Sequence, residues 1–112
     1  MKTIIDFVRP MPEARTVVSH SFGKALYGGP YYDTQSVENV LKPQCLLATG
    51  MNGQPLPEVY GAPLRLRVEN QLGYKMVKWI KRIEFVESEK SAGEGEGGKN
   101  EDDEYFDLLP NI

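Results

Sequence analysis

The chain has 112 residues, of which 40% are hydrophobic and 26% charged, so it fits one domain or part of one and is not a disordered polypeptide. Its net charge of -3 argues against a nucleic-acid-binding protein, and its lone cysteine, Cys45, excludes an internal disulfide and a Cys/His zinc cluster. No apolar run approaches the roughly 20 residues of a membrane span, and residues 1–7 are too short for a secretory signal, so we expect a cytoplasmic protein.

The first elements along the chain are short. Residues 16–21 are rich in β-branched side chains and predict a strand, whereas glycines and tyrosines around 27–32 predict a loop. The polar run that ends at Ser36 can cap a helix over 36–42. The apolar run over 45–48 predicts a buried strand.

The middle of the chain predicts further strands around a tight turn. Asn52 and Gly53 both tolerate positive φ, which a type I′ hairpin turn needs. Residues 64–68 alternate apolar residues with arginine and predict a strand. Residues 77–87 suit either a helix or a strand, but their β-branched and aromatic content favours a strand after one helical turn at 75–78, with Trp79 in the core. These elements favour an α+β, β-rich fold: a small mixed or antiparallel sheet with one short helix.

We expect one partial domain over residues 1–112. Its core spans 9–87, and the Glu/Gly/Lys/Ser-rich stretch 88–104 predicts a flexible acidic loop. Apolar residues return at 105–112, which predicts a C-terminus that docks back onto the core.

Charge is distributed unevenly. Residues 65–82 carry six cations against one acid, a balance of +5, whereas residues 83–112 carry ten acids against two lysines, a balance of -8. Clustered cations repel one another unless a counter-charge arrives, so the band at 65–82 indicates an anion-binding surface. The alternative is a solvated strand face that the acidic stretch neutralises.

Three motifs, in this order and spacing, carry a resemblance to a known family. They are LLATGMNGQPLP at 46–57, YGAPLRL at 60–66 and LGYKMVKWI at 72–80. Together they resemble the sulfite-oxidase-type molybdopterin-binding oxidoreductases, a family that includes the catalytic subunit of the bacterial methionine sulfoxide reductase. The resemblance runs from about 9 to 87, and it implies the C-terminal half of that family's domain and part of its molybdopterin-binding fold.

The resemblance also implies a binding site for the pyranopterin of the molybdenum cofactor. It gives Arg65 a contact with the pterin, and it places Tyr60 where the family commonly has His or Asn. Met76, Val77 and Lys78 then offer backbone groups and one lysine. These residue types suit the ligand, because a planar arginine pairs with pterin heteroatoms or phosphate oxygens and a lysine supplies a point charge.

The family's metal ligand is a cysteine in the preceding half of the domain, so the resemblance implies no metal ligand in this chain. The apolar neighbours of Cys45 raise the pKa of a thiol and favour a role in the core. His20 is interpreted as a hydrogen-bonded structural residue rather than a general base. Tyr27, Tyr31 and Tyr32 either pack a loop or line a substrate funnel.

The implied function is a partial cofactor-binding module of an oxidoreductase whose intact relatives catalyse two-electron oxygen-atom transfer at molybdenum. We expect the chain to be inactive alone, and a homo-oligomer or a chain carrying the N-terminal half would complete it. The alternative is a non-catalytic interaction module that retains only the fold. Nucleic-acid binding through 65–82 is disfavoured, because the acidic stretch would repel phosphates. Relatives of this type are often periplasmic.

Overall fold

Short strands make up most of the structure, a computed structural model that describes residues 1–24, 29–68, 75–93 and 97–99. The helices are α1 (Lys2–Val8) and α2 (Val37–Val40), with single 3-10 turns at Glu58–Tyr60 and Glu89–Ser91. The strands are β1 (Thr16–Lys24), β2 (Pro30–Ser36), β3 (Cys45–Ala48), β4 (Gly50–Met51), β5 (Gln54–Pro55), β6 (Arg65–Val68) and β7 (Ile80–Val86). No helix in these ranges is both long and apolar enough to cross a membrane.

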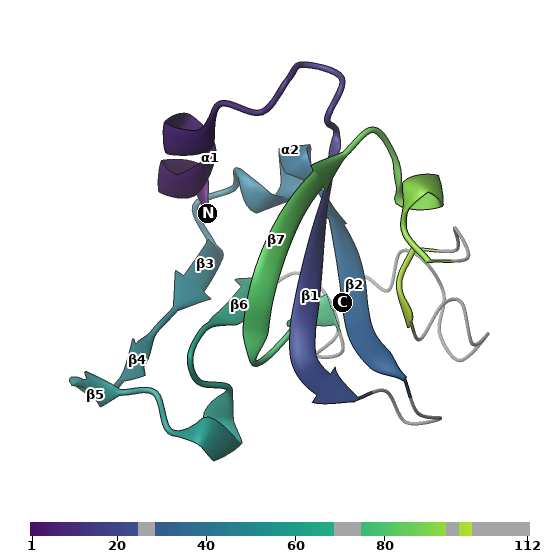
Figure 1. The fold of residues 1–112 in the computed structure, drawn as a ribbon. Coiled ribbons are helices and arrows are strands. Elements are labelled where there is room, and N and C mark those ends of the chain that lie inside the picture. Colours follow the sequence, from purple (N-terminus) through teal and green to yellow (C-terminus); the bar gives the residue numbers. More distant parts are fainter. Residues whose placement is uncertain (25–28, 69–74, 94–96, 100–112) are drawn as a thin grey trace.

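The largest sheet has three antiparallel strands in the order β2-β1-β7, and Figure 1 shows them as a twisted layer. In the central strand, Val17 pairs with Gln35 on one side and with Phe85 on the other. Val17 and its neighbour Val18 are both fully buried, although successive side chains of a strand point to opposite faces. Both faces of β1 are therefore covered, which suits its β-branched composition.

Two smaller antiparallel pairs lie beside this sheet. β3 pairs with β6, and β4 pairs with β5 as a hairpin. Asn52 and Gly53 connect the hairpin with φ values of 52° and 76°, so the predicted turn is confirmed. Leu66 and Val68 of β6 are buried and Arg67 is exposed, which confirms the predicted alternation.

The hydrophobic core fills the space between the three-stranded sheet, the β3–β6 pair and the helices. Each fully buried aliphatic side chain stabilises the fold by about 1.5–3 kcal/mol relative to an exposed one. The buried members of the core come from seven segments of the chain: Met1, Val17, Val40, Cys45, Leu66, Val68, Val77 and Ile80.

The predicted helix over 36–42 is confirmed as α2. Its N-cap is Ser36, whose hydroxyl accepts a hydrogen bond from the backbone N–H of Asn39 at 3.0 Å. The sequence left Lys2–Val8 unassigned, yet it forms α1, which an ion pair of 2.7 Å between Lys2 and Asp6 stabilises.

Strand β2 was not predicted from the sequence. Tyr31 and Tyr32 lie in the strand rather than in a loop, so that part of the loop prediction was wrong. Pairing with β1 explains the difference, because the register joins Tyr32 to His20. Tyr27 lies outside the described residues.

The end of the described chain returns to β2. Within the stretch predicted as an acidic loop, Gly97 accepts a hydrogen bond from the backbone N–H of Thr34 at 3.1 Å, and Gly98 forms a β-bridge with Asp33. Ala92 is buried. The segment predicted to dock at 105–112 lies outside the described residues.

Candidate functional site

Residues 75–79 form the segment that precedes β7, and backbone hydrogen bonds connect this segment to residues in and near β6. The N–H of Leu66 donates to the carbonyl oxygen of Val77 at 2.8 Å, and the N–H of Trp79 donates to that of Gly61 at 3.1 Å. Trp79 itself has a φ of 52°, in the left-handed region, so the chain turns sharply before the strand starts at Ile80. This turn directs successive residues of the segment to different surroundings.

A β-bulge in β1 supplies a third anchor. The register between β1 and β7 shifts after His20, and the hydroxyl of the next residue, Ser21, donates to the carbonyl oxygen of Lys78 at 2.7 Å. The same hydroxyl accepts from the N–H of Gly23 at 2.8 Å. Bulges often redirect a side chain near a functional site, and here the redirected side chain is that of Ser21.

Gly61 brings two cationic residues together. A β-carbon on this glycine would lie 3.1 Å from Cβ of Arg65 and 3.2 Å from Cβ of Lys78. Its φ of 113° lies in the region that favours glycine. Arg65 and Lys78, from different segments of the chain, therefore pack against the same point of the backbone.

The guanidinium of Arg65 has spare donor capacity. Its Nη1 donates to the carbonyl oxygen of Tyr60 at 3.1 Å. Its Nε is buried and, within the described ranges, has no hydrogen-bond partner. An unpaired buried donor is unfavourable by about 1–3 kcal/mol, so it marks a place where a ligand acceptor would be stabilising. Tyr60 is half-exposed, and it contacts Arg65 through its backbone oxygen rather than its hydroxyl.

A pocket of about 220 Å³ lies beside Lys78, whereas Tyr60, Gly61 and Arg65 are not among the residues that line it. Three of the five residues predicted to bind the cofactor line it, and so do the bulge residue Ser21 and the aromatic ring of Trp79. The full lining is Ser21, Gly23, Lys24, Tyr31, Met76, Val77, Lys78 and Trp79.

Trp79 is a wall of this pocket and not a core residue, so its predicted place in the core was wrong. The ring packs over Gly23, where an added β-carbon would lie 2.9 Å from Cε3 of the tryptophan. The ammonium of Lys78 lies 5.8 Å from the ring centroid, within the range of a cation–π interaction. The left-handed backbone at Trp79 takes it out of the alternation of β7, which explains the difference.

The predicted basic band is not one surface. Lys75 is buried and paired with Asp33, so it is not available to an anion from solvent. Arg82 lies 3.6 Å from a carboxylate oxygen of Glu84. Arg65 and Lys78 remain together at Gly61. Charge along the sequence therefore overstated the size of the cationic site.

His20 confirms its predicted role as a hydrogen-bonded residue. Its Nε2 lies 3.0 Å from a carboxylate oxygen of Glu84 and 3.1 Å from Nη2 of Arg82. Because Nε2 carries either a proton or a lone pair, it donates to Glu84 or accepts from Arg82, but not both. A second hollow, of about 500 Å³, borders this group, and Tyr31 and Ser21 lie between it and the first pocket.

Cys45 is confirmed as a core residue. It pairs with Val68 in the β3–β6 ladder and is buried. Burial raises the pKa of its thiol, and the positive charge of the N-terminus offsets only part of this effect. A neutral buried thiol is a poor metal ligand. The described residues contain no group of three or more His, Cys, Asp or Glu side chains that could hold a metal ion.

The site fits a flat, anionic, heteroatom-rich ligand such as a pyranopterin. Gly61 leaves room for the backbone and both cations at one point, and Arg65 Nε lacks an acceptor among the described residues. A planar guanidinium with free N–H groups can pair with ring heteroatoms or phosphate oxygens, and Lys78 adds a positive charge.

Comparisons with known proteins find a matching family model and several similar relatives. The family model for the oxidoreductase molybdopterin binding domain matches residues 1–93. The chain is 47% identical over 58 residues to the protein-methionine-sulfoxide reductase catalytic subunit MsrP of Xanthomonas campestris pv. campestris and to that of Xanthomonas axonopodis pv. citri, over 52% of this chain and 18% of each relative. It is 37% identical over 76 residues to the subunit of the same name from Pseudomonas syringae pv. tomato, over 68% of this chain and 23% of the relative. The matches thus span about a fifth of the length of these curated relatives.

Proposed function

Because the chain belongs to the family of oxidoreductase molybdopterin-binding domains, we propose that it binds the pyranopterin of a molybdenum cofactor at the site around Gly61. The observation that carries this proposal is the convergence of Arg65 and Lys78 on one glycine, with a buried guanidinium donor that lacks a partner among the described residues. When bound, such a cofactor supplies two-electron oxygen-atom transfer at molybdenum. The residues of this chain would bind, orient and charge-balance it.

Each predicted site residue has a distinct role in this proposal. Arg65 donates to ring heteroatoms or phosphate oxygens, and Lys78 balances negative charge. Met76 and Val77 line the pocket and offer backbone groups. Tyr60 acts indirectly, because its carbonyl oxygen fixes one end of the guanidinium.

We further propose that the chain forms the C-terminal part of a cofactor-binding domain and that the remaining part of that domain completes the site. Its match to the curated relatives covers only about a fifth of their length. The metal-binding cysteine would come from the completing part, since Cys45 is buried and protonated at neutral pH.

Titration with molybdopterin tests the proposal directly. The purified chain is mixed anaerobically with molybdopterin, and binding is followed by pterin fluorescence. We expect Lys78→Gln to weaken binding about tenfold, or ~1.4 kcal/mol. The matched control is Lys81→Gln, because Lys81 lies over the ring of Phe22, away from Gly61. Absence of binding by the unaltered chain, also after the completing part is added, would refute the proposal.

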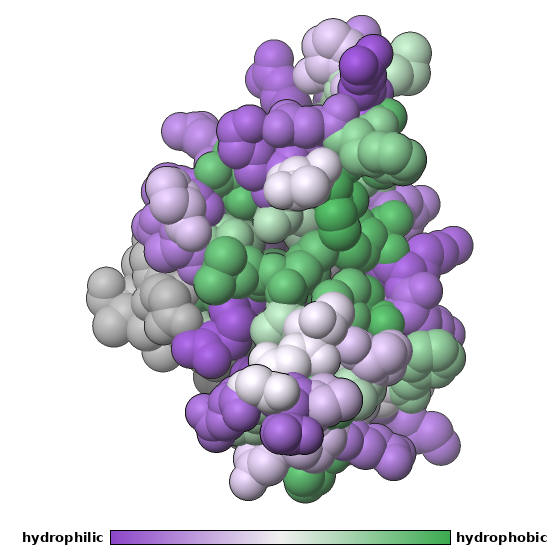
Figure 2. All heavy atoms as spheres, turned by 90° about the vertical axis from the view of Figure 1, so that its left-hand side faces the viewer, coloured by the Kyte–Doolittle hydropathy of each residue, from purple (hydrophilic) through white to green (hydrophobic). Residues whose placement is uncertain are grey.

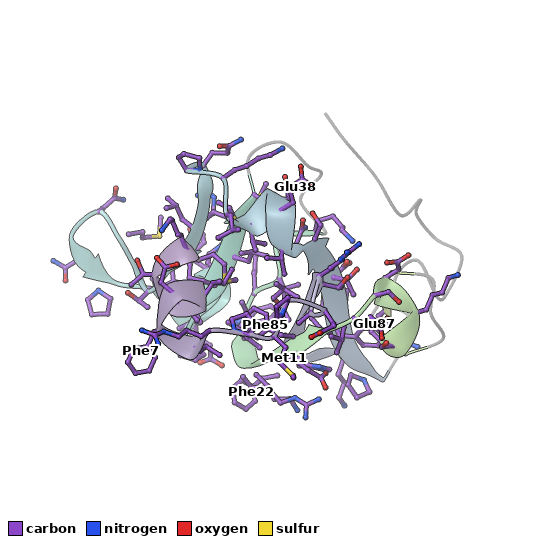
Figure 3. The ribbon with its side chains drawn as sticks, turned by 90° about the horizontal axis from the view of Figure 1, so that it is seen from above. Phe7, Met11, Phe22, Glu38, Phe85 and Glu87 are labelled. Atoms are coloured by element: carbon purple, nitrogen blue, oxygen red, sulfur yellow. The ribbon has the colours of Figure 1, made fainter. Side chains whose placement is uncertain are left out.

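A second candidate function is a non-catalytic interaction module, favoured by the exposed apolar residues. Figure 2 shows hydrophobic side chains gathered at the centre of the face that α1, β3 and β6 border in Figure 1. Leu46 of β3 is 56% exposed there, and on α1 Phe7 is 88% exposed. Phe7, Met11 and Phe22 are also exposed, and they lie towards the lower edge of Figure 3, a different side of the molecule from the face in Figure 2. Apolar patches of this kind mark protein interfaces.

Sedimentation at several concentrations separates the two functions. An interaction module would self-associate or bind the completing part of the domain without retaining molybdopterin, and Phe22→Ser combined with Phe7→Ser would abolish the association. The control is Phe85→Leu, since Phe85 is partly buried against the core and not freely exposed. Turnover of methionine sulfoxide or sulfite by the completed protein would exclude a purely non-catalytic role.

A further inference from the structure

A buried ion pair lies directly beside the candidate cofactor site. The ammonium of Lys75 contacts Oδ1 of Asp33, and the two side chains are only 2% and 1% exposed. Removing two charges from water is unfavourable by several kcal/mol per ion, and apolar residues of similar volume often give an equally stable core. A contribution to stability alone is therefore a weak explanation for a buried ion pair between Asp33 and Lys75.

The carboxylate of Asp33 has contacts of its own besides Lys75. Asp33 lies in β2, opposite Ser19 of the central strand. Its Oδ1 also accepts a hydrogen bond from the N–H of Thr34 at 2.7 Å, and its Oδ2 lies 3.4 Å from the hydroxyl of Tyr31. The negative charge is thus attached to the most extensively paired sheet of the molecule.

Lys75 immediately precedes the segment that lines the pocket. Downstream of it, the segment is attached through Val77 to β6, through Lys78 to β1 and through Trp79 to Gly61. All three attachments are hydrogen bonds to backbone groups of the segment. The attachment at Lys75 differs, because it is a side-chain charge and it fixes the segment to β2.

We propose that the Asp33–Lys75 pair is a positioning device that holds the segment Met76–Lys78 against β2, so that its backbone and the Lys78 ammonium face the pterin. This inference rests on the proposed function for the identity of the ligand. Neither Asp33 nor Lys75 needs to touch the cofactor. Their contribution is to fix the start of the segment before the ligand arrives, which reduces the ordering required on binding.

Amide hydrogen exchange tests the positioning without any cofactor. The N–H groups of Leu66 and Trp79 report on the segment, because they close the bonds to Val77 and Gly61. In Asp33→Asn we expect these two amides to exchange at least tenfold faster relative to the other protected amides. The control is Val40→Ala, which creates a cavity at a fully buried position in α2 and should accelerate all protected amides together.

Cofactor affinity is the second readout. Since Asp33→Asn alone removes the negative charge that contacts a buried lysine and can unfold the chain, the double variant Asp33→Leu/Lys75→Met provides a folded, uncharged comparison. We expect it to retain stability but to bind molybdopterin about tenfold more weakly than the unaltered chain, because small displacements of binding groups have large effects.

The outcomes separate the two proposals. Unchanged exchange at Leu66 and Trp79 in Asp33→Asn, or wild-type molybdopterin affinity in the double variant, would overturn the positioning role. Failure of the unaltered chain to bind molybdopterin would instead overturn the proposed function, and the exchange experiment would still report whether the ion pair fixes the segment.

Discussion

Arg65 and Lys78 pack beside the same glycine, because a β-carbon on Gly61 would lie 3.1 Å from Cβ of Arg65 and 3.2 Å from Cβ of Lys78, although the two residues belong to different segments of the chain. Hydrogen bonds on both sides enforce this arrangement: Trp79 donates to Gly61, and Leu66 donates to Val77. Two like charges would separate if only the side chains placed them, so the backbone pairing sustains the cluster.

Gly61→Ala should therefore damage both the fold and the site. The added methyl would approach Arg65 and Lys78 to within about 3 Å at a φ that alanine rarely adopts. We expect a loss of about 1–3 kcal/mol in the free energy of unfolding and a clear loss of molybdopterin affinity. Urea denaturation and pterin titration measure the two effects.

Gly53→Ala is the matched control, because Gly53 also has a positive φ but has open space around its β-carbon position. It should lose about 1 kcal/mol of stability and keep its affinity. Equal affinities for Gly61→Ala and Gly53→Ala would contradict the role given to Gly61.

Local sequence patterns predicted the elements whose signals are local. The turn at Asn52-Gly53, the alternation in β6 and the cap of α2 each depend on residues within a few positions of one another, and each is confirmed. α1 went unassigned because it is only seven residues long and none of them is buried, so the sequence carries no helical stripe of core positions. The fold class could thus be predicted from short-range chemistry and the family resemblance.

The site was predicted less completely, because its geometry depends on long-range contacts. Nothing near Lys75 in the sequence indicates that Asp33 in β2 neutralises it. The alternation of apolar and polar residues along a strand likewise does not predict the bulge at Ser21 or the left-handed backbone at Trp79. Ser21 and Gly23 line the pocket but were not predicted to do so. The signal in the sequence was a serine followed two residues later by a glycine at the end of a β-branched strand.

Arg65→Lys keeps the charge but removes the planar donor group, so it separates charge from geometry. We expect molybdopterin affinity to fall about tenfold or more, since the unpaired Nε and the second donor are lost together. Stability should change little, because the buried donor without a described partner is removed as well. Pterin titration and thermal unfolding measure these quantities.

The control for that substitution is Arg82→Lys in the same basic stretch. Arg82 is exposed and contacts His20 and Glu84. Its replacement should leave affinity unchanged. If both lysine variants bind as tightly as the unaltered chain, the guanidinium of Arg65 is not a ligand-binding group.

Cys45 gives a pH prediction with a definite sign. Burial raises the pKa of its thiol above the ordinary value of 9.0, so the folded state holds the proton at pH values where the unfolded state releases it. The stabilising effect is full below pH 9.0 and is lost as the pH rises through the folded value. The free energy of unfolding should therefore decline above about pH 9 more steeply in the unaltered chain than in Cys45→Ala. Parallel pH profiles of the two proteins would contradict the assignment.

Ser21→Ala tests the third anchor of the segment, at the bulge in β1. The substitution leaves the carbonyl oxygen of Lys78 and the N–H of Gly23 without their partner, and we expect a loss of about 1–3 kcal/mol of stability. It should also weaken molybdopterin binding, because the backbone at Lys78 is released beside the pocket.

Ser36→Ala distinguishes this effect from general destabilisation. It removes the cap of α2, where Ser36 accepts from Asn39, and should lose about 1 kcal/mol of stability without reaching the pocket. Urea denaturation establishes how far each serine variant is destabilised, and titration at a temperature where both stay folded compares their affinities. The Ser21 hydroxyl bonds to the backbone at Lys78 beside the pocket, whereas the Ser36 hydroxyl caps α2. Only Ser21→Ala should therefore bind the pterin more weakly. A similar affinity in both variants would mean that Ser21 stabilises the sheet but does not place Lys78.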